Sequence, residues 1–419
     1  MCAGRAGAGG GGLMQVFVPV PLSRVQLGRV LPVDVWTPDG RLLMRHGQPL
    51  QSEAHRELLA AHGACMTETD ALAWQMSLER SMRQMRADGV DMATIARAPM
   101  PAEIADTDYQ EGRVVEGGWL DLQEVLRGLL YQGADASNPL PRLQGIEQKA
   151  QALLRRDPDE ALFVLFQALP DLRLGYCATH ALLAGVVAAL TADKLEQPED
   201  SPALLLRSAL VMNIGMARPQ DSLARQLRPP NPAQRQIIAA HGPASTDILR
   251  SFGLHEDELL SLVQWHHQPQ AAALQPPQHG YLRMLNLADS LIAKMAPRSS
   301  RAAMLPLAAA KSLMQTTSPD TADLRPAMAA VLGFYPPGSY VQLVNGETAV
   351  VVKRGRRANA PHVATIMNAS GMPIAKYVYH DTSDSLAPRY AVLAPVASAT
   401  VKVSVSLEKV RRLRHQNGV

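Results

Sequence analysis

Residues 209–220 read ALVMNIGMARPQ, and this stretch decides how the whole chain is interpreted. An apolar helix runs into the pair Met212-Asn213 and opens at Ile214-Gly215. A helix that stays apolar up to its last turn is typical of the core of a helical domain. The stretch therefore predicts a helical core in the middle of the chain. It also raises the question of why that helix ends on a methionine beside an asparagine.

The helical pattern extends on both sides of this stretch, from Asp121 to about Ala330. Asp121 with Glu124 predicts a capping box for a helix that runs through Gln132. Three further capping residues each precede a proline at an expected helix start: Asp157-Pro158, Ser201-Pro202 and Asn231-Pro232. A segment of about 200 residues is the size of one domain, so we predict a helical domain at 121–330.

Residues 14–70 are predicted to form a small N-terminal β/α module. The segments VLPVDVW and RLLMRHG flank a turn at Thr37-Pro38-Asp39-Gly40, where proline presets φ and glycine accepts a positive φ. Ser52 is expected to cap a short helix that runs through His62.

Residues 71–120 are predicted to be a helix followed by a linker. The apolar residues of this helix favour packing within the chain, and the alternative is a dimer helix. Residues 1–13 are rich in glycine and alanine and are expected to form a disordered tail, with Met14 as an alternative start.

Residues 331–419 change to a period of two, which predicts a small C-terminal β module. YVQLV and ETAVVVK flank Asn345-Gly346, a strong hairpin signal. PHVATIM, RYAVLAP and ATVKVSVS are expected to be further strands, followed by a basic helix from Leu407 to Arg414. The basic run Lys353–Arg357 is predicted to be a hairpin loop. The fold class is therefore mainly α, a helical bundle flanked by two small β-containing modules.

The composition describes a globular chain with few special features. Hydrophobic residues make up 47% of the 419 residues, and the formal net charge is only +3, which argues against a nucleic-acid partner. Three scattered cysteines fit a reducing cytosol better than a disulfide framework. No apolar run approaches the ~20 residues that cross a bilayer, and the first residues lack the apolar segment of a secretory signal. We therefore expect a cytoplasmic protein that does not enter a membrane.

Candidate site residues stand out as polar side chains on apolar helices. They are His180, His241, the pair His266-His267, and Asp289. Any one such histidine is more often a hydrogen-bonded core residue than a ligand. Together, on successive helices of one bundle, imidazoles and a carboxylate are what a metal or phosphate site is made of.

The order of these residues resembles the HD-type phosphohydrolases, in particular the HD-GYP domains that hydrolyse cyclic di-GMP. The resemblance runs from about Tyr176 to Ala296 and implies an HD-type helical bundle. His180, His241, His266, His267 and Asp289 match the family's metal-binding positions in order. The segment ALVMNIG falls where the family reads Leu-Leu-His-Asp-Ile-Gly.

The chain departs from the family at positions that the family uses for catalysis. Met212 stands at the place of a histidine ligand, and Asn213 stands at the place of the aspartate that bridges two metals. Met216 occupies the place of a lysine, and Tyr176 replaces a glutamate that some members use for a further metal. The Gly-Tyr-Pro loop after the histidine pair is also missing, because Gly280-Tyr281 is followed by leucine.

These departures predict a degenerate site that does not catalyse. A neutral asparagine cannot replace a bridging carboxylate, and a thioether is a poor ligand for Mn, Fe or Mg. The matching residues could still hold one divalent metal (Fe, Mn or Zn), or they could form a metal-free hydrogen-bonded core. The favoured interpretation is a bacterial signalling protein that binds a partner protein or cyclic di-GMP, with a homo-oligomer compatible with the sequence. The alternatives are an active metal-dependent phosphodiesterase and a purely structural scaffold.

Overall fold

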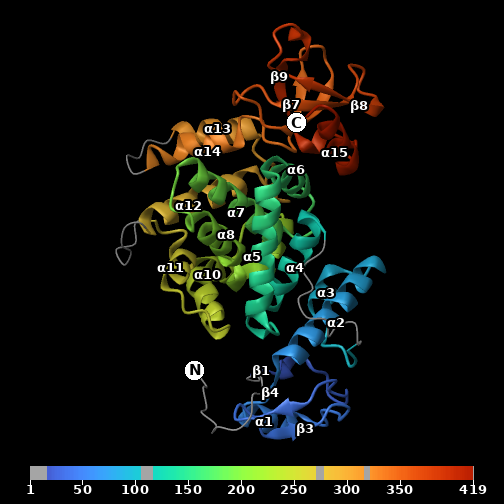
Figure 1. The fold of residues 1–419 in the computed structure, drawn as a ribbon, viewed down its shortest axis with the longest axis vertical. Helices are drawn as coiled ribbons and strands as arrows, with labels where there is room; N and C mark the ends of the chain where they lie inside the picture. The colour runs from blue at the N-terminus through green and yellow to red at the C-terminus, as the bar shows by residue number, and fades with distance from the viewer. Residues whose placement is uncertain (1–16, 105–116, 270–277, 316–320, 419) are drawn as a thin grey trace. The chain divides into compact units, whose positions relative to one another are not determined.

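The structure, a computed structural model, describes residues 17–104, 117–269, 278–315 and 321–418. It is mainly helical, with a small antiparallel sheet toward each end of the chain, which confirms the predicted fold class (Figure 1). The predicted tail 1–13 and most of the predicted linker lie outside the described residues.

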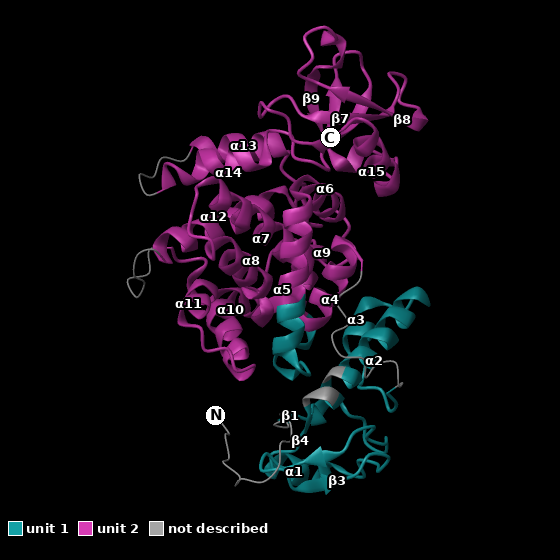
Figure 2. Cartoon of the chain, viewed as in Figure 1, with its two compact units in different colours: residues 1–116, 131–145 teal, residues 117–130, 146–419 magenta. Residues whose placement is uncertain are grey.

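The chain divides into two compact units (Figure 2). Unit 1 comprises residues 1–116 and 131–145, and unit 2 comprises residues 117–130 and 146–419. The predicted helical domain and C-terminal β module therefore belong largely to one unit. The finer division into separate domains stays a prediction.

In its described residues, unit 1 contains a four-stranded antiparallel sheet of order β1-β4-β2-β3, three complete α-helices and the first part of α5 (Pro139–Arg156). Their bounds are β1 (Phe17–Pro19), β2 (Val35–Trp36), β3 (Leu42–Met44), α1 (Glu53–Ala61), β4 (Cys65–Thr67), α2 (Glu68–Ala87) and α3 (Met92–Ala96). The turn at Thr37–Gly40 joins β2 to β3 as predicted, with Gly40 at φ +86°. Ser52 caps α1, where its hydroxyl accepts a hydrogen bond from the His55 N–H.

The single helix predicted at the start of residues 71–120 is two helices in the structure. α2 gives way to a turn in which Gly89 adopts φ +76°, and Asp91 caps α3. Met82 and Met85 of α2 pack against the core of unit 1, and the Trp74 indole N–H donates to the Pro101 carbonyl at 2.8 Å. The helix therefore packs within the chain, as the sequence favours.

Unit 2 carries the helical bundle, to which most of α4 and the second part of α5 belong. The helices are α4 (Trp119–Gln132), α5 (Pro139–Arg156), α6 (Pro158–Ala168), α7 (Tyr176–Lys194), α8 (Ser201–Val211), α9 (Ala217–Arg225), α10 (Pro232–Ser251), α11 (Asp257–Trp265), α12 (Gln278–Met295), α13 (Pro306–Gln315) and α14 (Leu324–Leu332). A 3₁₀ turn, η4 (Ile214–Met216), separates α8 from α9.

α7 is the core helix of this bundle, and it is buried from Tyr176 to Ala192. It packs closely on α8, because a Cβ at Gly185 would lie 2.8 Å from the Leu206 side chain. Within the described residues, α7 is also the one helix long and apolar enough to cross a membrane by length and composition, and 94% of that window is buried inside the protein. Its apolar character is therefore accounted for by its place in the core.

The helix starts follow the capping signals in two cases and depart from them in two. Asp157 caps α6, and Asn231 forms a full capping box with Gln234. Ser201 does not cap α8 but occupies its first position, because its hydroxyl donates to the Tyr281 hydroxyl instead. Asp121 lies inside α4 and accepts a hydrogen bond from the Gly118 N–H, so the helix begins earlier than predicted.

α10 does not end at Gly242-Pro243, although a proline usually breaks or kinks a helix. The helix continues through Pro243 to Ser251. A proline inside a helix costs about 3 kcal/mol because it removes one backbone hydrogen bond. Burial of Ser245, Thr246 and Leu249 on the far side of the proline offsets that cost and holds the helix together.

The C-terminal sheet has five antiparallel strands in the order β8-β7-β6-β5-β9. The strands are β5 (Tyr340–Leu343), β6 (Thr348–Lys353), β7 (His362–Met367), β8 (Pro373–Asp381) and β9 (Val392–Val396), followed by α15 (Leu407–Gln416). The Asn345-Gly346 hairpin joins β5 to β6 as predicted. The prediction of a strand over ATVKVSVS is wrong, and β8 has no counterpart in the sequence prediction.

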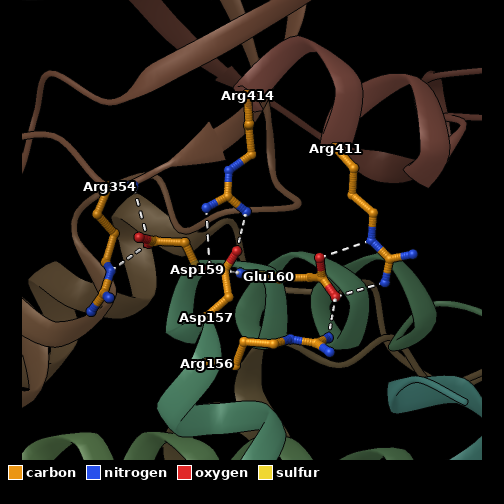
Figure 3. A network of polar contacts seen from close by, with 7 residues as sticks. All are labelled: Arg156, Asp157, Asp159, Glu160, Arg354, Arg411 and Arg414. Carbon is orange, nitrogen blue, oxygen red and sulfur yellow. Dashed lines mark hydrogen bonds and ion pairs between the residues drawn. The ribbon is translucent and has the colours of Figure 1, made fainter. Parts of the chain in front are cut away.

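A network of ion pairs joins the first turn of α6 to the C-terminal β module and α15 (Figure 3). Asp159 pairs with Arg354 at 2.6 Å, and Glu160 pairs with Arg411 at 2.7 Å. Asp157 both caps α6 and pairs with Arg414 at 2.9 Å. Beside these pairs, the Tyr340 hydroxyl donates to the Gln167 amide oxygen at 3.0 Å. The network fixes the sheet to the helical part of unit 2.

Candidate metal centre

His241 of α10 and His266 at the end of α11 face each other in the interior. Their Nε2 atoms lie 3.0 Å apart. The Nδ1 atom of His266 lies 2.7 Å from the Val263 carbonyl oxygen, and the Nδ1 atom of His241 contacts the Ile238 carbonyl oxygen. A carbonyl oxygen only accepts hydrogen bonds, so both Nδ1 atoms carry the proton. Two bare Nε2 lone pairs therefore point at each other.

Asp289 of α12 joins the remaining residues to this pair. Its Oδ1 atom lies 2.7 Å from His180 Nε2, and its Oδ2 atom lies 3.9 Å from His267 Nδ1. One ring nitrogen from each of His241, His266 and His267 lies within 4.8 Å of the others. His180, His241, His266 and Asp289 are buried, and the His267 side chain is half-exposed.

The interior position shifts the pKa values of these groups in a consistent way. Burial lowers the pKa of His266 from 6.5 to about 3, and it also lowers the pKa of His241. Burial by itself raises the pKa of Asp289, but the His180 hydrogen bond and the neighbouring imidazoles outweigh it, so that this pKa falls from 3.8 to about 2. At neutral pH the centre therefore combines an ionised carboxylate with two uncharged imidazoles.

α7 carries His180, and its N-terminus is capped by a residue that lies far away in the sequence. The Asp221 carboxylate of α9 accepts a hydrogen bond from the Cys177 N–H at 2.6 Å and so caps α7. A glycine is needed at position 175, with φ +95°, because a Cβ there would lie 2.5 Å from the Arg127 side chain. The Tyr176 ring then stacks on the His180 ring with centroids 5.2 Å apart.

Met212 and Asn213 lie against α10 one turn after His241. The Ser245 hydroxyl donates to the Met212 carbonyl at 2.9 Å and accepts from the Gly215 N–H at 3.0 Å. A Cβ at Gly215 would lie 3.0 Å from the His241 carbonyl oxygen, so the approach is close. Met212 and Asn213 are both buried, and the Asn213 amide nitrogen and oxygen have no hydrogen-bond partner among the described residues.

The structure thus brings together the five residues that the sequence singles out, His180, His241, His266, His267 and Asp289. Their role as metal ligands stays a prediction, as does the loss of catalysis ascribed to Met212, Asn213 and Met216. Two further positioning residues, Asp221 and Ser245, were not expected from the sequence: Asp221 caps the start of α7, and Ser245 holds the turn after α8. Asp221 and Cys177 are 44 positions apart, so no local pattern signals their contact.

The donor set fits one divalent metal ion. Nitrogens that share an ion at ~2.1 Å lie roughly 3 to 3.5 Å apart, close to the His241–His266 separation. In both His241 and His266 the Nδ1–H group donates a hydrogen bond to a backbone carbonyl oxygen, as the second ring nitrogen of a metal-bound histidine usually does. A cation between the facing Nε2 atoms would also relieve their lone-pair repulsion.

Comparison with known proteins gives little further information. No family model matches the chain, and no curated protein matches it. Among solved structures, the chain is similar to Bd1817, a HDG"Y"P protein from Bdellovibrio bacteriovorus, at 14% sequence identity and a TM-score of 0.39. The match covers 76% of this chain and 99% of that chain. A likeness this distant assigns neither a family nor a function.

Proposed function

We propose that this chain is a non-catalytic, degenerate HD-GYP-like signalling protein of the bacterial cytoplasm. It acts by binding a partner protein or cyclic di-GMP, and its helical domain keeps one metal-binding centre. The observation that carries the proposal is the pair of bare Nε2 atoms of His241 and His266, 3.0 Å apart in the interior. Protonation does not relieve this contact at neutral pH, because the pKa of His266 is about 3.

The residues that would hold the ion are His241, His266 and His267, with Asp289 beside them. When bound, a divalent Fe, Mn or Zn ion supplies positive charge at which an anionic ligand can bind. Asp289 balances that charge, and its hydrogen bond from His180 fixes its orientation. The half-exposed His267 lies on the solvent side of the set.

The proposed lack of catalysis follows from Met212 and Asn213. Hydrolysis at a binuclear centre needs an anionic bridge between two cations, and an uncharged amide does not supply one. Asn213 is buried, so water does not screen the repulsion of two cations at this position. One metal without hydrolysis is therefore the state that this donor set supports best.

Metal analysis of the purified protein tests the metal part of the proposal. We expect up to one divalent ion per chain in the wild type and a clear loss of metal in His241→Ala. His255→Ala is the matched control, because His255 is exposed in the segment between α10 and α11. Retention of the metal in His241→Ala would refute the centre. A metal-free wild type that takes up none of the three ions would favour a purely structural scaffold.

A hydrolysis assay with cyclic di-GMP separates binding from catalysis. We expect no turnover above background with Mn, Fe or Mg, and a binding assay with the same nucleotide distinguishes a nucleotide ligand from a protein partner. The second candidate function, a metal-dependent phosphodiesterase, is favoured by the convergence of His180, His241, His266, His267 and Asp289. Turnover that requires metal and disappears in His241→Ala would establish it.

A further inference from the structure

A second polar cleft lies away from the histidine centre, where the helical part of unit 2 meets the C-terminal sheet. Its volume is about 610 Å³, which is in the range of small-molecule sites. The wall is formed by the start of α6, the end of α7, the end of α14 and the loop between β6 and β7. None of the five residues of the candidate metal centre lines it.

Cationic side chains predominate in this cleft. Lys194 comes from α7, and Arg354, Arg356 and Arg357 come from the β6–β7 loop, facing the carboxylates of Asp159 and Asp193. Arg354 is already engaged, since it pairs with Asp159 at 2.6 Å and donates to the Val331 carbonyl at 2.9 Å.

The other three cations are available to a ligand. Within the described part of the chain, the side chains of Lys194, Arg356 and Arg357 make no hydrogen bond or ion pair, and all three are exposed. The charge of Arg356 does contribute, after other groups, to the lowered pKa of the nearby Asp381 carboxyl. The three cations come from two different elements, so their charges meet because of the fold and not because of their sequence order. This separates the cleft from an ordinary solvated run of basic residues.

The loop that carries the arginines is tightly built. A Cβ at Gly355 would lie 1.8 Å from the Ala360 carbonyl oxygen, so only glycine fits where the loop folds back. The Ala358 carbonyl accepts a hydrogen bond from the Phe334 N–H at 2.8 Å, and the Ala360 N–H donates to the Arg357 carbonyl at 3.1 Å. A backbone fixed in this way lowers the entropy that a ligand must remove on binding.

We propose that this cleft binds a small ligand that carries a phosphate or diphosphate group. The guanidinium groups of Arg356 and Arg357 supply paired donors that match phosphate oxygens, and Lys194 supplies a charge from the opposite element. Asp193 offers an acceptor for a hydroxyl or amine of the same ligand. The site goes beyond the proposed function, because it needs neither the metal centre nor its histidines.

Calorimetric titration of the full chain with pyrophosphate tests the proposal. The full chain is first treated with chelator, so that no bound metal ion can attract the anion. We then expect saturable binding of one pyrophosphate per chain. Arg356→Gln with Arg357→Gln should weaken it by about tenfold or more, because each substitution removes charge-assisted hydrogen bonds to phosphate oxygens. Lys194→Met should weaken the binding as well. If pyrophosphate bound to the β6–β7 loop alone, this substitution on α7 would have no effect. Arg412→Gln is the control, since Arg412 is exposed on α15 and, among the described residues, pairs with Glu408 alone.

Further probes identify the ligand type and separate this site from the metal centre. Binding of AMP without binding of adenosine would show that the phosphate carries recognition. His241→Ala should leave pyrophosphate binding unchanged, so failure of the metal proposal does not remove this one. The proposal is overturned if pyrophosphate does not saturate, if the double arginine variant binds as tightly as wild type, or if only oligonucleotides bind.

Discussion

At the scale of single residues, Asn213 has the largest unmet hydrogen-bonding demand near the candidate metal centre. It is 2% exposed, and both polar atoms of its amide lack a partner among the described residues. A buried polar group without a partner costs about 1 to 3 kcal/mol. A carboxylate at the same place would cost more, unless a cation neutralised it.

The double substitution Met212→His with Asn213→Asp tests for the metal centre through the melting temperature, which reports the cost of burying the new carboxylate. In chelator the variant should melt below wild type, because it buries an unpaired carboxylate. With Mn, Fe or Zn its melting temperature should rise clearly more than that of wild type, because metal binding stabilises the folded state. Phosphodiesterase activity should stay low, since Met216 and the missing Gly-Tyr-Pro loop are unchanged.

A thermal-shift series with each metal and with chelator measures this effect. A matched control places the same two side chains at exposed positions, Met372→His with Asn359→Asp. The control should show no metal-dependent shift beyond that of wild type. Equal melting of the double variant under every condition would show that the histidines do not form a metal site.

The residues of the candidate site could be predicted from the sequence, but their pairing could not. Asp289 stands out because a carboxylate on an apolar helix face needs a partner, and the structure supplies His180. The helix pattern does not show which histidine pairs with Asp289, because His180 and Asp289 are 109 positions apart. The bridge made by Ser245 between Met212 and Gly215 is hidden for the same reason.

At the scale of secondary-structure elements, the contact between α10 and α11 positions His241 beside His266. Gly242 makes this contact possible, because a Cβ there would lie 2.5 Å from the Gln264 carbonyl oxygen. The neighbouring atom is backbone, so a larger residue forces the two helices apart. His266 follows Gln264 by two positions and moves with it.

Gly242→Ala should therefore lower the free energy of unfolding by about 1 to 3 kcal/mol, the usual cost of overpacking. Gly145→Ala is the control, because Gly145 lies in helix α5 and its added Cβ meets nothing within 4 Å. That substitution should raise stability by up to ~1 kcal/mol through helix propensity. Urea unfolding of the two variants measures both effects, and equal stabilisation by the two alanines would contradict the close contact.

Elements with local signals could be predicted, and those defined by a distant partner could not. Asp157 and Asn231 start helices because their caps bond within three residues. The ATVKVSVS segment alternates like a strand, but β9 already occupies the edge of β5. The segment instead leads into α15, and the Ser406 N–H donates to the Tyr377 hydroxyl.

At the scale of the whole molecule, unit 2 combines an apolar bundle with a sheet that ion pairs join to the first turn of α6. Asp159 and Glu160 are nearly buried, with side chains 10% and 8% exposed, whereas Glu408 of the α15 surface pair is 80% exposed. Breaking a buried pair leaves an uncompensated charge, but an exposed pair contributes little. The α6 network therefore stabilises the attachment far more than its surface counterpart.

Asp159→Ala should destabilise unit 2 by roughly 1 to 3 kcal/mol, because Arg354 then keeps only its hydrogen bond to the Val331 carbonyl among the described residues. Glu408→Ala, the control, should cost less than about 1 kcal/mol. Urea unfolding gives the magnitudes, and limited proteolysis shows whether residues 331–419 become accessible first. If the two variants have the same stability and the same cleavage pattern, the network does not hold the sheet.

The ribosome makes the acidic first turn of α6 long before it makes the arginines of α15 that pair with it. Glu160 precedes its partner Arg411 by 251 residues, and Asp157 precedes Arg414 by 257. At roughly 5 to 20 residues per second, a ribosome needs about 12 to 50 seconds to add that length of chain. During this interval the bundle can form while these carboxylates remain hydrated, so the surface that later receives the sheet stays soluble on the nascent protein. Docking of α15 is then a late, charge-guided step in biosynthesis.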